Sequence, residues 1–503
     1  MDGGTRFAEL RARLAEINDL TRTMALLSWD QHVTMPAGGA AARACQLETV
    51  GRIRHQKFVD PEIGRLLDDL RDWSEQQDYE SFEASLVRVT KRDWEKAVRV
   101  PADLQAARTR AAALGYDVWV DARKHSDFQA FLPALRENLD LTKRYIDCFE
   151  PGDEPYDILL DDFERDLKTA EVRRIFDYLK EHQAPLIAEH AHPHEPTRGP
   201  FARQLQEQFE REVVRAFGFD ERAWRLDPTV HPFASGTSID DIRLTTRYFD
   251  DNLDGLFGTM HEFGHGLYEH QVDRGLERSP LARGASLGLH ESQSRMWENL
   301  VGRSLPFWRY WFPRLQELYP HAFAGYDVDR WYAEVNTVEP SLIRVEADEV
   351  TYNFHIILRF ELEQELIAGS FPLEQLPEEW NRRIWEYLGI DVPDDRRGVL
   401  QDVHWSSGSL GYFSTYALGN LISAQILDKV TADIPGLEDG FADGEFAPLR
   451  DWLREHLHRH GRKFTPAETL ERVVGTRKID PEPYVRYLSG KFGEIYGTAL
   501  SSQ

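Results

Sequence analysis

The chain has very few cysteines and no long run of apolar residues. Cys45 and Cys148 are the only 2 cysteines among 503 residues, too few for a disulfide framework, so we expect a reducing compartment. No apolar stretch approaches the roughly 18 residues that a membrane span needs, and Met1–Arg6 lacks the apolar core of a signal peptide. We therefore expect a cytoplasmic protein with no membrane partner.

Positive charge is scarce relative to negative charge. The chain carries 60 Lys and Arg against 86 Asp and Glu, which leaves a formal net charge of −26 at pH 7. Because phosphate binding needs clustered Lys and Arg, we expect no nucleic acid partner. The acidic balance does not identify a basic substrate, since such charge usually covers a solvated surface and keeps a protein soluble.

Signals for β-strands are sparse, whereas helical periodicity recurs along the chain. Apolar residues repeat at amphipathic helical spacing at Phe7, Leu10, Leu14 and Ile17 and again at Leu205, Phe209, Val213 and Phe217. Neither an internal repeat nor a low-complexity tract divides the sequence. We predict a mainly α protein, folded as a single large helical body with a very small β element.

The strongest strand signal covers residues 242–249. We predict a short edge strand there, along a substrate cleft, because an extended peptide can add itself to an exposed sheet edge. The pauses in the helical pattern do not separate domains clearly. We therefore treat residues 1–503 as one domain, with residues 1 to about 200 as an N-terminal helical portion flanking the cleft and about 201–503 as the catalytic portion.

The stretch His-Glu-Phe-Gly-His at residues 261–265 carries the clearest chemical signal. Two imidazoles four residues apart on a helix lie one turn apart, so His261 and His265 can hold one Zn²⁺. Glu262 then faces the open position of the metal, where it can take a proton from bound water. Such a pentad arises by chance in roughly one per cent of chains of this length, so by itself it indicates a metallopeptidase without proving one.

The surroundings of the pentad predict a helix from Asp254, as N-cap, to Gly275, as the stop. One apolar stripe runs along it through Leu256, Met260, Phe263 and Leu267. At about 100° per residue, the two histidines and the glutamate fall on the opposite side. A helix packed by its stripe would present all three into a cleft; the alternative is a polar, solvated face.

A catalytic zinc keeps one position for water, so a third protein ligand must exist. The metzincin continuation requires Gly and His three and six residues after His265, where this chain has Tyr268 and Gln271, so that class is excluded. Glu269 shares the helix face but lies one turn further, about 6 Å along the axis. It therefore suits a supporting role behind the ligands better than a bond to the metal.

The best candidate for the third ligand is Glu291, on the next predicted helix, which Ser286 caps. It lies opposite the apolar stripe of that helix and would face across the cleft. The alternative is an ion pair with Arg295, four residues later, worth only a few tenths of a kcal/mol. Spacing leaves both interpretations open.

Two other groups of histidines are candidates for metal binding, and we interpret both as structural. The groups are His190, His192 and His194, and His456, His458 and His460. The first alternates just before a proline-rich loop, which is typical of a polar connector. The second lies near a predicted helix C-terminus, where cationic side chains interact favourably with the helix dipole.

The pentad followed by His-Glu-Ser-Gln-Ser-Arg at residues 290–295 resembles the M32 family of metallocarboxypeptidases. Other blocks of the chain resemble the same family in the same order. They are Trp29-Asp30-Gln31 with Met35-Pro36, His231-Pro232-Phe233, Asp241 to Thr245, Ile343-Arg344 to Asp348, and Gly398 to Trp405. Because these blocks span almost the whole chain, the resemblance is specific.

The resemblance implies several features that spacing does not provide. It identifies Glu291 as the third ligand beside His261 and His265, with Zn²⁺ as the metal and Co²⁺ as a substitute. It implies a gluzincin-like metal helix, a long deep active-site groove and a homodimer. It also implies peptide substrates, from which single C-terminal residues of broad identity are released.

The reaction needs donors for the oxyanion besides the metal, and losing one such donor typically costs about 10²–10³ in rate. His404, Tyr412 and Tyr416 are candidates by similarity to related helical zinc peptidases. Glu262 serves as general base and then as general acid toward the leaving amine. For Tyr412 the alternative is simple packing beside Gly411 and Phe413.

An exopeptidase of this type must also recognise a free C-terminal carboxylate. An arginine fork binds carboxylate with two hydrogen bonds and stays charged at every relevant pH. Arg344 is the first candidate and Arg243 the second; the alternative for each is an internal ion pair, with Asp348 or Asp241 as the local partner. His231 is predicted to line the site, without an assigned role.

The sequence thus predicts a metal-dependent carboxypeptidase. An oligopeptidase that cuts short peptides internally would show the same metal motif. A non-catalytic metal- or peptide-binding protein is a third alternative, which the intact Glu262 disfavours because binding alone requires no general base.

Overall fold

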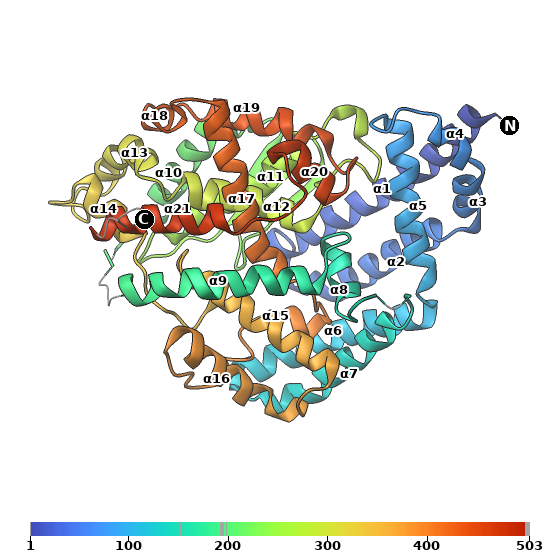
Figure 1. Cartoon of the computed structure of the whole chain (residues 1–503), viewed down its shortest axis with the longest axis horizontal. Coiled ribbons are helices and arrows are strands. Elements are labelled where there is room, and N and C mark those ends of the chain that lie inside the picture. The colour runs from blue at the N-terminus through green and yellow to red at the C-terminus, as the bar shows by residue number, and fades with distance from the viewer. Residues whose placement is uncertain (1, 151, 192–195, 198, 498–503) are drawn as a thin grey trace. The chain divides into compact units, whose positions relative to one another are not determined.

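A computed structural model of the chain describes residues 2–150, 152–191, 196–197 and 199–497 (Figure 1). The described part is built from helices with one three-stranded sheet, which confirms the predicted mainly α class. His192 and His194 of the first histidine group lie outside the described residues. No described helix is long and apolar enough to cross a bilayer.

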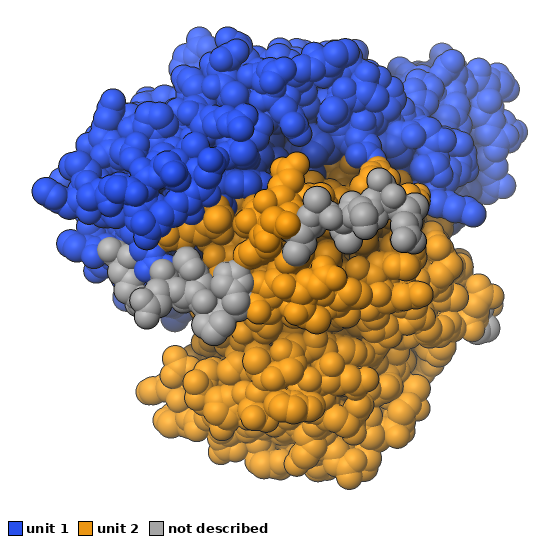
Figure 2. Space-filling model, turned by 60° about the vertical axis from the view of Figure 1, so that its left-hand side comes forward, with its two compact units in different colours: residues 1–98, 196–332, 426–478 blue, residues 99–195, 333–425, 479–503 orange. Residues whose placement is uncertain are grey.

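The chain groups into two compact units, coloured separately in Figure 2. Unit 1 comprises residues 1–98, 196–332 and 426–478, and unit 2 comprises residues 99–195, 333–425 and 479–503. One change of unit, at Pro196, falls near the division predicted at about residue 200. Residues 1–98, however, group with the segment that carries the metal motif, so the units interleave along the chain.

Unit 1 contains the sheet and helices from each of its three segments. They are α1 (Gly3–Val33), α2 (Ala40–Phe58), α3 (Pro61–Asp69), α4 (Arg71–Glu75), α10 (Arg203–Phe217), α11 (Asp254–His270), α12 (Leu287–Arg295), α13 (Leu305–Leu318), α18 (Leu437–Ala442), α19 (Ala447–His456) and α20 (Pro466–Val474), while α5 (Phe82–Arg99) and α14 (Val328–Val335) begin in unit 1 and end in unit 2. The predicted stripe of Phe7, Leu10, Leu14 and Ile17 is buried on α1, where it joins a core with Leu residues of α3 and α5.

Unit 2 is helical in its described residues. Its helices are α6 (Ala102–His125), α7 (Phe128–Ile146), α8 (Asp157–Phe163), α9 (Thr169–His190), α15 (Tyr352–Ala368), α16 (Leu376–Leu388) and α21 (Glu482–Tyr496), and α17 (Ser414–Asp433) begins in it and ends in unit 1. Helices α6 and α7 lie side by side (Figure 1). The buried face of α15 supplies Ile356, Ile357, Leu358 and Phe360 to the core of this unit.

The sheet of unit 1 corrects one prediction. Strand β3 (Asp241–Thr246) is not an edge strand: it lies between β1 (Trp224–Pro228), with which it pairs in parallel, and β2 (Ala234–Ser238), with which it pairs antiparallel. The flanking strands escaped prediction because one ends in Asp-Pro and the other reads Ala-Ser-Gly-Thr-Ser, neither of which has strand-forming alternation. With both sides of β3 paired, this strand offers no edge to a peptide.

The ends of the metal-motif helix also differ from the prediction. Asp254 is the first residue of α11 rather than its cap, which is Leu253, and the helix ends at His270, with Gln271 as C-cap. Gly275 lies instead in a short 3₁₀ helix, η2 (Arg274–Leu276). The apolar stripe is buried as expected, with Leu256, Met260, Phe263 and Leu267 each at most 3% exposed.

Candidate metal centre and arginine cluster

Helices α11 and α12 approach closely because of a glycine inside the His-Glu-Phe-Gly-His motif. A Cβ on Gly264 would lie 2.2 Å from the backbone oxygen of Gln293, so no larger residue fits at this contact. Ser286 caps α12 as predicted, since its side chain accepts a hydrogen bond from the backbone N–H of Leu289. The close contact brings Glu291 opposite the two histidines.

His261, His265 and Glu291 form a candidate metal site, with one ligand atom of each within 4.8 Å of the others. Oε2 of Glu291 lies 3.8 Å from Nε2 of His261 and 3.4 Å from Nε2 of His265. Two ligands of a tetrahedral Zn²⁺, each bonded at about 2.0–2.1 Å, are separated by about 3.4 Å. The three donor atoms therefore fit one ion of this size, with a fourth position left for water.

The two interpretations of Glu291 are compatible with each other, because each would use a different oxygen. Oε1 accepts a hydrogen bond from Nε of Arg295 at 2.8 Å, and Oε2 faces the histidines. The side chain is 5% exposed. The ion pair with Arg295 thus orients the carboxylate rather than competing with a metal for it.

The far nitrogens of both histidines have partners, which leaves the Nε2 atoms for the metal. Nδ1 of His261 lies 2.8 Å from Oε2 of Glu298, and Nδ1 of His265 lies 2.6 Å from Nδ1 of His290. Glu298 belongs to η3 (Met296–Val301), a π-helix that continues α12. Such one-turn π segments are frequent at functional sites, because they rotate side chains out of the α-helical register.

Negative charge is in excess at this centre. The carboxylates of Glu291 and Glu298 share the guanidinium of Arg295, and the charges of both act on the buried Glu262. Burial lowers the pKa of His261, but the charge of Glu291 and the hydrogen bond to Glu298 outweigh burial and raise that pKa to about 9. A proton and a metal ion are attracted to the same Nε2 for the same reason, so the site suits a divalent cation.

Glu262 follows His261 on α11 and is buried, with 8% of its surface exposed. Burial raises its pKa, the charge of His261 partly offsets burial, and the resulting pKa is about 7. A carboxylate with a pKa close to neutrality can both accept and return a proton.

Arg344, Arg359 and Asp402 form a second buried cluster, in unit 2. The guanidinium of Arg344 donates to Asp402 through Nε and through Nη2 at 2.8 Å, and through Nη1 to the hydroxyl of Tyr352 at 3.0 Å. Arg359 donates to the same carboxylate at 2.8 Å. The alternative of an internal ion pair is therefore present for Arg344, but its partner is Asp402 and not Asp348.

Burial raises the pKa of Asp402, but Arg344 and Arg359 outweigh burial and hold that pKa well below its usual range. Two arginines in contact with one carboxylate leave an excess of positive charge. Arg344 has five N–H bonds and uses three of them in these contacts. The remaining two lie on its terminal nitrogens.

His404, Tyr412 and Tyr416 lie together in the same unit, close to Arg344. Nε2 of His404 is 3.3 Å from the hydroxyl of Tyr416, and the rings of the two tyrosines are 5.3 Å apart. The guanidinium of Arg344 lies 4.8 Å from the ring centre of Tyr416. Burial lowers the pKa of His404 to about 4, so this imidazole is neutral near pH 7.

Glu363 of α15 holds the segment that carries these side chains. Its carboxylate accepts hydrogen bonds from Nε1 of Trp405 at 2.7 Å, the backbone N–H of Gly411 at 2.7 Å and the hydroxyl of Tyr156 at 2.6 Å. Burial raises the pKa of Glu363 to about 7 despite these three donors. The segment between His404 and Tyr412 is thereby fixed at both ends.

Two predicted substrate-binding residues lie apart from this cluster, in unit 1. Arg243 donates twice to Asp241, both at 2.9 Å, and its guanidinium lies 4.4 Å from the ring of Trp29. The internal ion pair predicted as its alternative is therefore what the structure contains. His231 is exposed on the turn between β1 and β2. A substrate contact for either residue stays a prediction.

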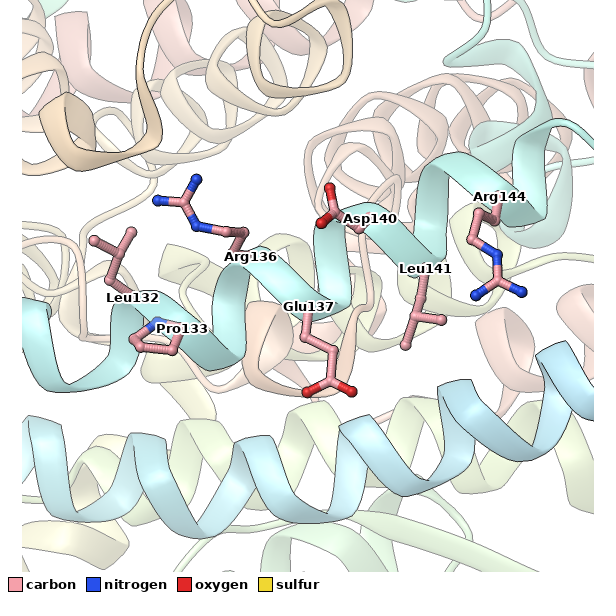
Figure 3. Close-up of a pocket in the computed structure, with 7 residues that line it drawn as sticks. All are labelled: Leu132, Pro133, Arg136, Glu137, Asp140, Leu141 and Arg144. Atoms are coloured by element: carbon pink, nitrogen blue, oxygen red, sulfur yellow. The ribbon is translucent and has the colours of Figure 1, made fainter.

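Sequence reasoning missed several partners of the predicted residues, among them His290, Glu298, Tyr352, Arg359 and Asp402. Glu298 follows Glu291 by seven residues, which on a helix indicates the same face. Asp402 lies in a family-like block, but nothing in the local sequence of Arg359 or Asp402 connects them with Arg344. The described residues also contain a surface hollow of about 490 Å³ along α7, lined by Leu132, Arg136, Asp140 and their neighbours (Figure 3). It includes no predicted site residue.

Comparisons with known proteins identify the family. A family model described as carboxypeptidase Taq (M32) metallopeptidase matches residues 9–492. Thermostable carboxypeptidase 1 of Thermus thermophilus is 40% identical over 488 residues, covering 94% of this chain and 95% of that protein. Carboxypeptidase 1 of Bacillus subtilis is 34% identical, covering 96% and 97%.

Solved structures show the same fold. The M32 carboxypeptidase of Deinococcus radiodurans R1 superposes with a TM-score of 0.94 at 39% identity, covering 98% of this chain and 100% of that one. A Pyrococcus furiosus carboxypeptidase structure gives a TM-score of 0.94 at 35% identity, covering 97% and 99%.

A helical protein with two histidines and a glutamate on facing helices, and a second glutamate inside the motif, has the architecture of a metallopeptidase. The chain belongs to the M32 family of metallopeptidases.

Proposed function

We propose that this protein is a metal-dependent carboxypeptidase that releases single C-terminal residues from peptides, with broad tolerance of the side chain removed. The observation that carries the proposal is the centre formed by His261, His265, Glu291 and Glu262, in a chain whose M32 relatives are named carboxypeptidases. The three ligands would hold Zn²⁺, with Co²⁺ as a substitute, since mixed imidazole and carboxylate sites accept both.

Glu262 is the proposed general base and acid. A metal held by the three ligands would supply Lewis acidity, which would polarise the scissile carbonyl and acidify a water molecule. Glu262 takes a proton from the water molecule while the water oxygen forms a bond to the carbonyl carbon. The same carboxyl then delivers the proton to the amine nitrogen as the C–N bond breaks.

Arg344 is the proposed anchor for the C-terminal carboxylate. The excess of positive charge in the Arg344–Asp402–Arg359 cluster favours a second carboxylate. Asp402 uses one side of the guanidinium and holds its plane, so the two remaining N–H bonds are oriented before substrate arrives. Such an anchor would restrict cleavage to the end of a peptide.

His404, Tyr412 and Tyr416 are the proposed donors to the developing oxyanion. All three can donate a hydrogen bond near neutral pH, because a neutral imidazole keeps one N–H and phenols stay protonated. Their mutual contacts, including the 3.3 Å approach of His404 to Tyr416, limit their motion.

The test is a time course with one unblocked peptide and its C-terminally amidated twin, in the presence of Zn²⁺ or Co²⁺, followed by mass spectrometry. We expect stepwise loss of C-terminal residues from the unblocked peptide alone. Varying the last residue of the peptide tests the breadth of specificity.

Each other outcome has a definite meaning. Internal cleavage of both peptides would identify an oligopeptidase and contradict the carboxylate anchor. Cleavage of neither, with a metal bound, would contradict catalysis and revive the alternative of a metal-binding protein.

We also propose a cytoplasmic homodimer. Both cysteines are free, Cys45 exposed and Cys148 partly buried, which suits a reducing compartment. Exposed apolar side chains on α6, among them Leu114 at 58% and Tyr116 at 50% exposure, are available for a contact between subunits. Light scattering after size-exclusion chromatography tests the dimer, and fractionation of the native cells tests the location.

A further inference from the structure

The two histidines of the metal centre are supported in different ways. His261 contacts a carboxylate directly, since its Nδ1 lies 2.8 Å from Glu298. His265 contacts another imidazole, since its Nδ1 lies 2.6 Å from Nδ1 of His290. Behind that second ring, Nε2 of His290 lies 3.1 Å from Oε1 of Glu269. The carboxylate that supports His265 is therefore one residue further away.

The positions of the hydrogens in this series of contacts, from His265 through His290 to Glu269, follow from the valence of the ring nitrogens. A metal on Nε2 of His265 uses the lone pair of that atom, so the neutral ring carries its hydrogen on Nδ1 and donates it. Nδ1 of His290 must then accept, which places the single hydrogen of His290 on Nε2. That hydrogen points to the carboxylate of Glu269. A second hydrogen on Nδ1 of His290 would oppose the one on His265 at 2.6 Å.

Glu269 is itself held in place from two sides. Its Oε1 also accepts a hydrogen bond from the backbone N–H of Gly284 at 3.2 Å. Its Oε2 lies 3.6 Å from Nη2 of Arg22, which comes from α1. Arg22 donates in addition to the backbone oxygens of Gly236 and Ala282, both at 2.7 Å. The series of side chains from His265 through His290 and Glu269 thus ends at Arg22, which makes three separate contacts.

The ring of His290 is also packed on its faces. A Cβ on Gly284 would lie 2.7 Å from Cδ2 of His290, so only glycine leaves room for the imidazole. The ring of Tyr268 lies 5.3 Å away on a tilted plane. The side chain is therefore restricted to an orientation that directs Nδ1 at His265.

We infer that His290 is a positioning residue for the metal centre, one that accepts a hydrogen bond from His265 and transmits to it the support of the Glu269 carboxylate. The inference rests on the proposed metal site and deepens it. His290 does not bind the metal; it orients His265 and increases the basicity of its Nε2. Partners of this kind typically change metal affinity by about 10–100-fold when they are removed.

The test measures metal affinity, by competition of the purified protein with a chromophoric chelator for Zn²⁺ and for Co²⁺. His290→Phe keeps a ring but removes the acceptor, and we expect the dissociation constant to rise about 10–100-fold. His290→Asn restores an acceptor near the position of Nδ1, and we expect it to recover most of the affinity. The visible absorption of the Co²⁺-loaded variants reports whether His265 keeps its geometry.

His270→Phe is the matched control, because His270 lies on the same helix as His265 but contacts the backbone oxygen of Ile239 instead. We expect its metal affinity to stay unchanged. Glu269→Ala removes the carboxylate but keeps both imidazole side chains, and it should weaken metal binding several-fold. Circular dichroism of the metal-free variants verifies the fold, and the Asn and Glu269 variants carry the test if the Phe variant fails to fold.

The outcomes separate this inference from the proposed metal site. Failure of the unchanged protein to bind one metal ion per chain contradicts the site itself. Normal binding by the unchanged protein, with His290→Phe binding within about twofold of it, contradicts only the role of His290. An Asn variant as weak as the Phe variant, or an unaffected Glu269→Ala variant, overturns the hydrogen-bonded relay as well.

Discussion

The metal centre and the arginine cluster are both buried and charged, but with opposite sign. In the first, Glu291 and Glu298 share the guanidinium of Arg295, and their charges act on Glu262. In the second, Arg344 and Arg359 share the single carboxylate of Asp402. Because an uncompensated charge is costly to bury, a partner of the opposite sign would stabilise each centre. A divalent cation suits the first and a peptide carboxylate the second.

The two centres also differ in how they are built. The ligands of the first, and the residues that directly contact its histidines, come from residues 261–298, on α11, α12 and η3, with α11 and α12 brought together at Gly264. The second joins Asp402 to Arg359 and Arg344, which precede it by 43 and 58 positions in the sequence. Short spacings made the first visible as a pattern, whereas the second depends on which side chains the fold places together. The following variants test whether the excess charge of each centre has the function proposed for it. The last one tests a buried acid outside both centres.

The largest effect is expected for Glu262→Gln, which removes the general base and keeps the volume of the side chain. We expect kcat to fall by about 10²–10⁴ while the bound metal is retained. Steady-state kinetics on an unblocked peptide and metal analysis of the same samples measure both quantities. The control is Glu317→Gln, in an exposed pair with Arg314. A loss below tenfold with metal in place would contradict the assigned role.

Asp402→Asn should cause the largest loss of stability, because it leaves two buried arginines without their carboxylate. Breaking a buried pair in this way costs about 3–5 kcal/mol. Urea unfolding at pH 7 measures the change. Asp394→Asn breaks the more exposed pair with Arg397, and we expect a loss of at most about 1 kcal/mol. Equal losses for the two variants would show that the cluster is not the buried, charge-coupled unit described above.

Arg344→Lys keeps the positive charge but removes the planar fork. We expect kcat/KM on the unblocked peptide to fall by about 10- to 150-fold, the equivalent of about 1.5–3 kcal/mol for a hydrogen bond to a charged group. Arg136→Lys, in an exposed pair with Glu374 of the same unit, should have no effect. If Arg344 is only structural, the variant will lose stability but will still discriminate fully between unblocked and amidated peptides.

The last prediction concerns the pH dependence of stability and Glu210, a buried acid on α10 that contacts no cationic side chain among the described residues. It accepts hydrogen bonds from the hydroxyls of Thr259 at 2.6 Å and Thr246 at 3.2 Å. Burial raises its pKa to about 8 despite these donors, with Glu207 raising and Arg211 lowering it slightly. Burial raises the pKa of the hydroxyls of Tyr248 and Tyr319, and the charge of Glu210 raises both further.

Since the folded pKa of Glu210 exceeds the unfolded one, the folded state holds a proton that the unfolded state releases above about pH 4.5. Stability therefore falls as the pH rises from about 5 to 8, by up to about 1.4 kcal/mol per unit. Glu210→Gln should remove that part of the slope, measured by urea unfolding at several pH values. Glu207→Gln, on the same helix, should leave the slope unchanged. An identical slope in Glu210→Gln would contradict a protonated Glu210.

Much of the metal centre was predictable because a helix repeats regularly. The burial of Leu256, Met260, Phe263 and Leu267 confirms the stripe, and with it the side of α11 on which the histidines lie. The cap at Ser286 was predictable for the same reason, since capping depends on neighbouring residues. The helix ends were less accurate, because the chain leaves α11 at His270 in response to packing that no local signal reports.

Strand β3 and Arg344 show where local patterns were insufficient. The residues of β3 are strand-like by themselves, but whether a strand is central depends on partners, and β1 and β2 carry no clear signal. For Arg344 the expected partner was the nearby Asp348, whereas the structure pairs it with Asp402. In both cases the sequence was compatible with several partners, and the fold determined which of them are in contact.

The sequence by itself determined the helical class, the identity of the metal-binding motif and the residue types that its chemistry needs, because these depend on spacings of a few residues along one helix. The tertiary structure decided which oxygen of Glu291 faces the histidines, which groups support each histidine, and which acid neutralises Arg344. Such choices depend on distances between segments that are far apart in the chain. They follow from the packing of helices, as at Gly264, where the absence of one side chain allows two helices to meet.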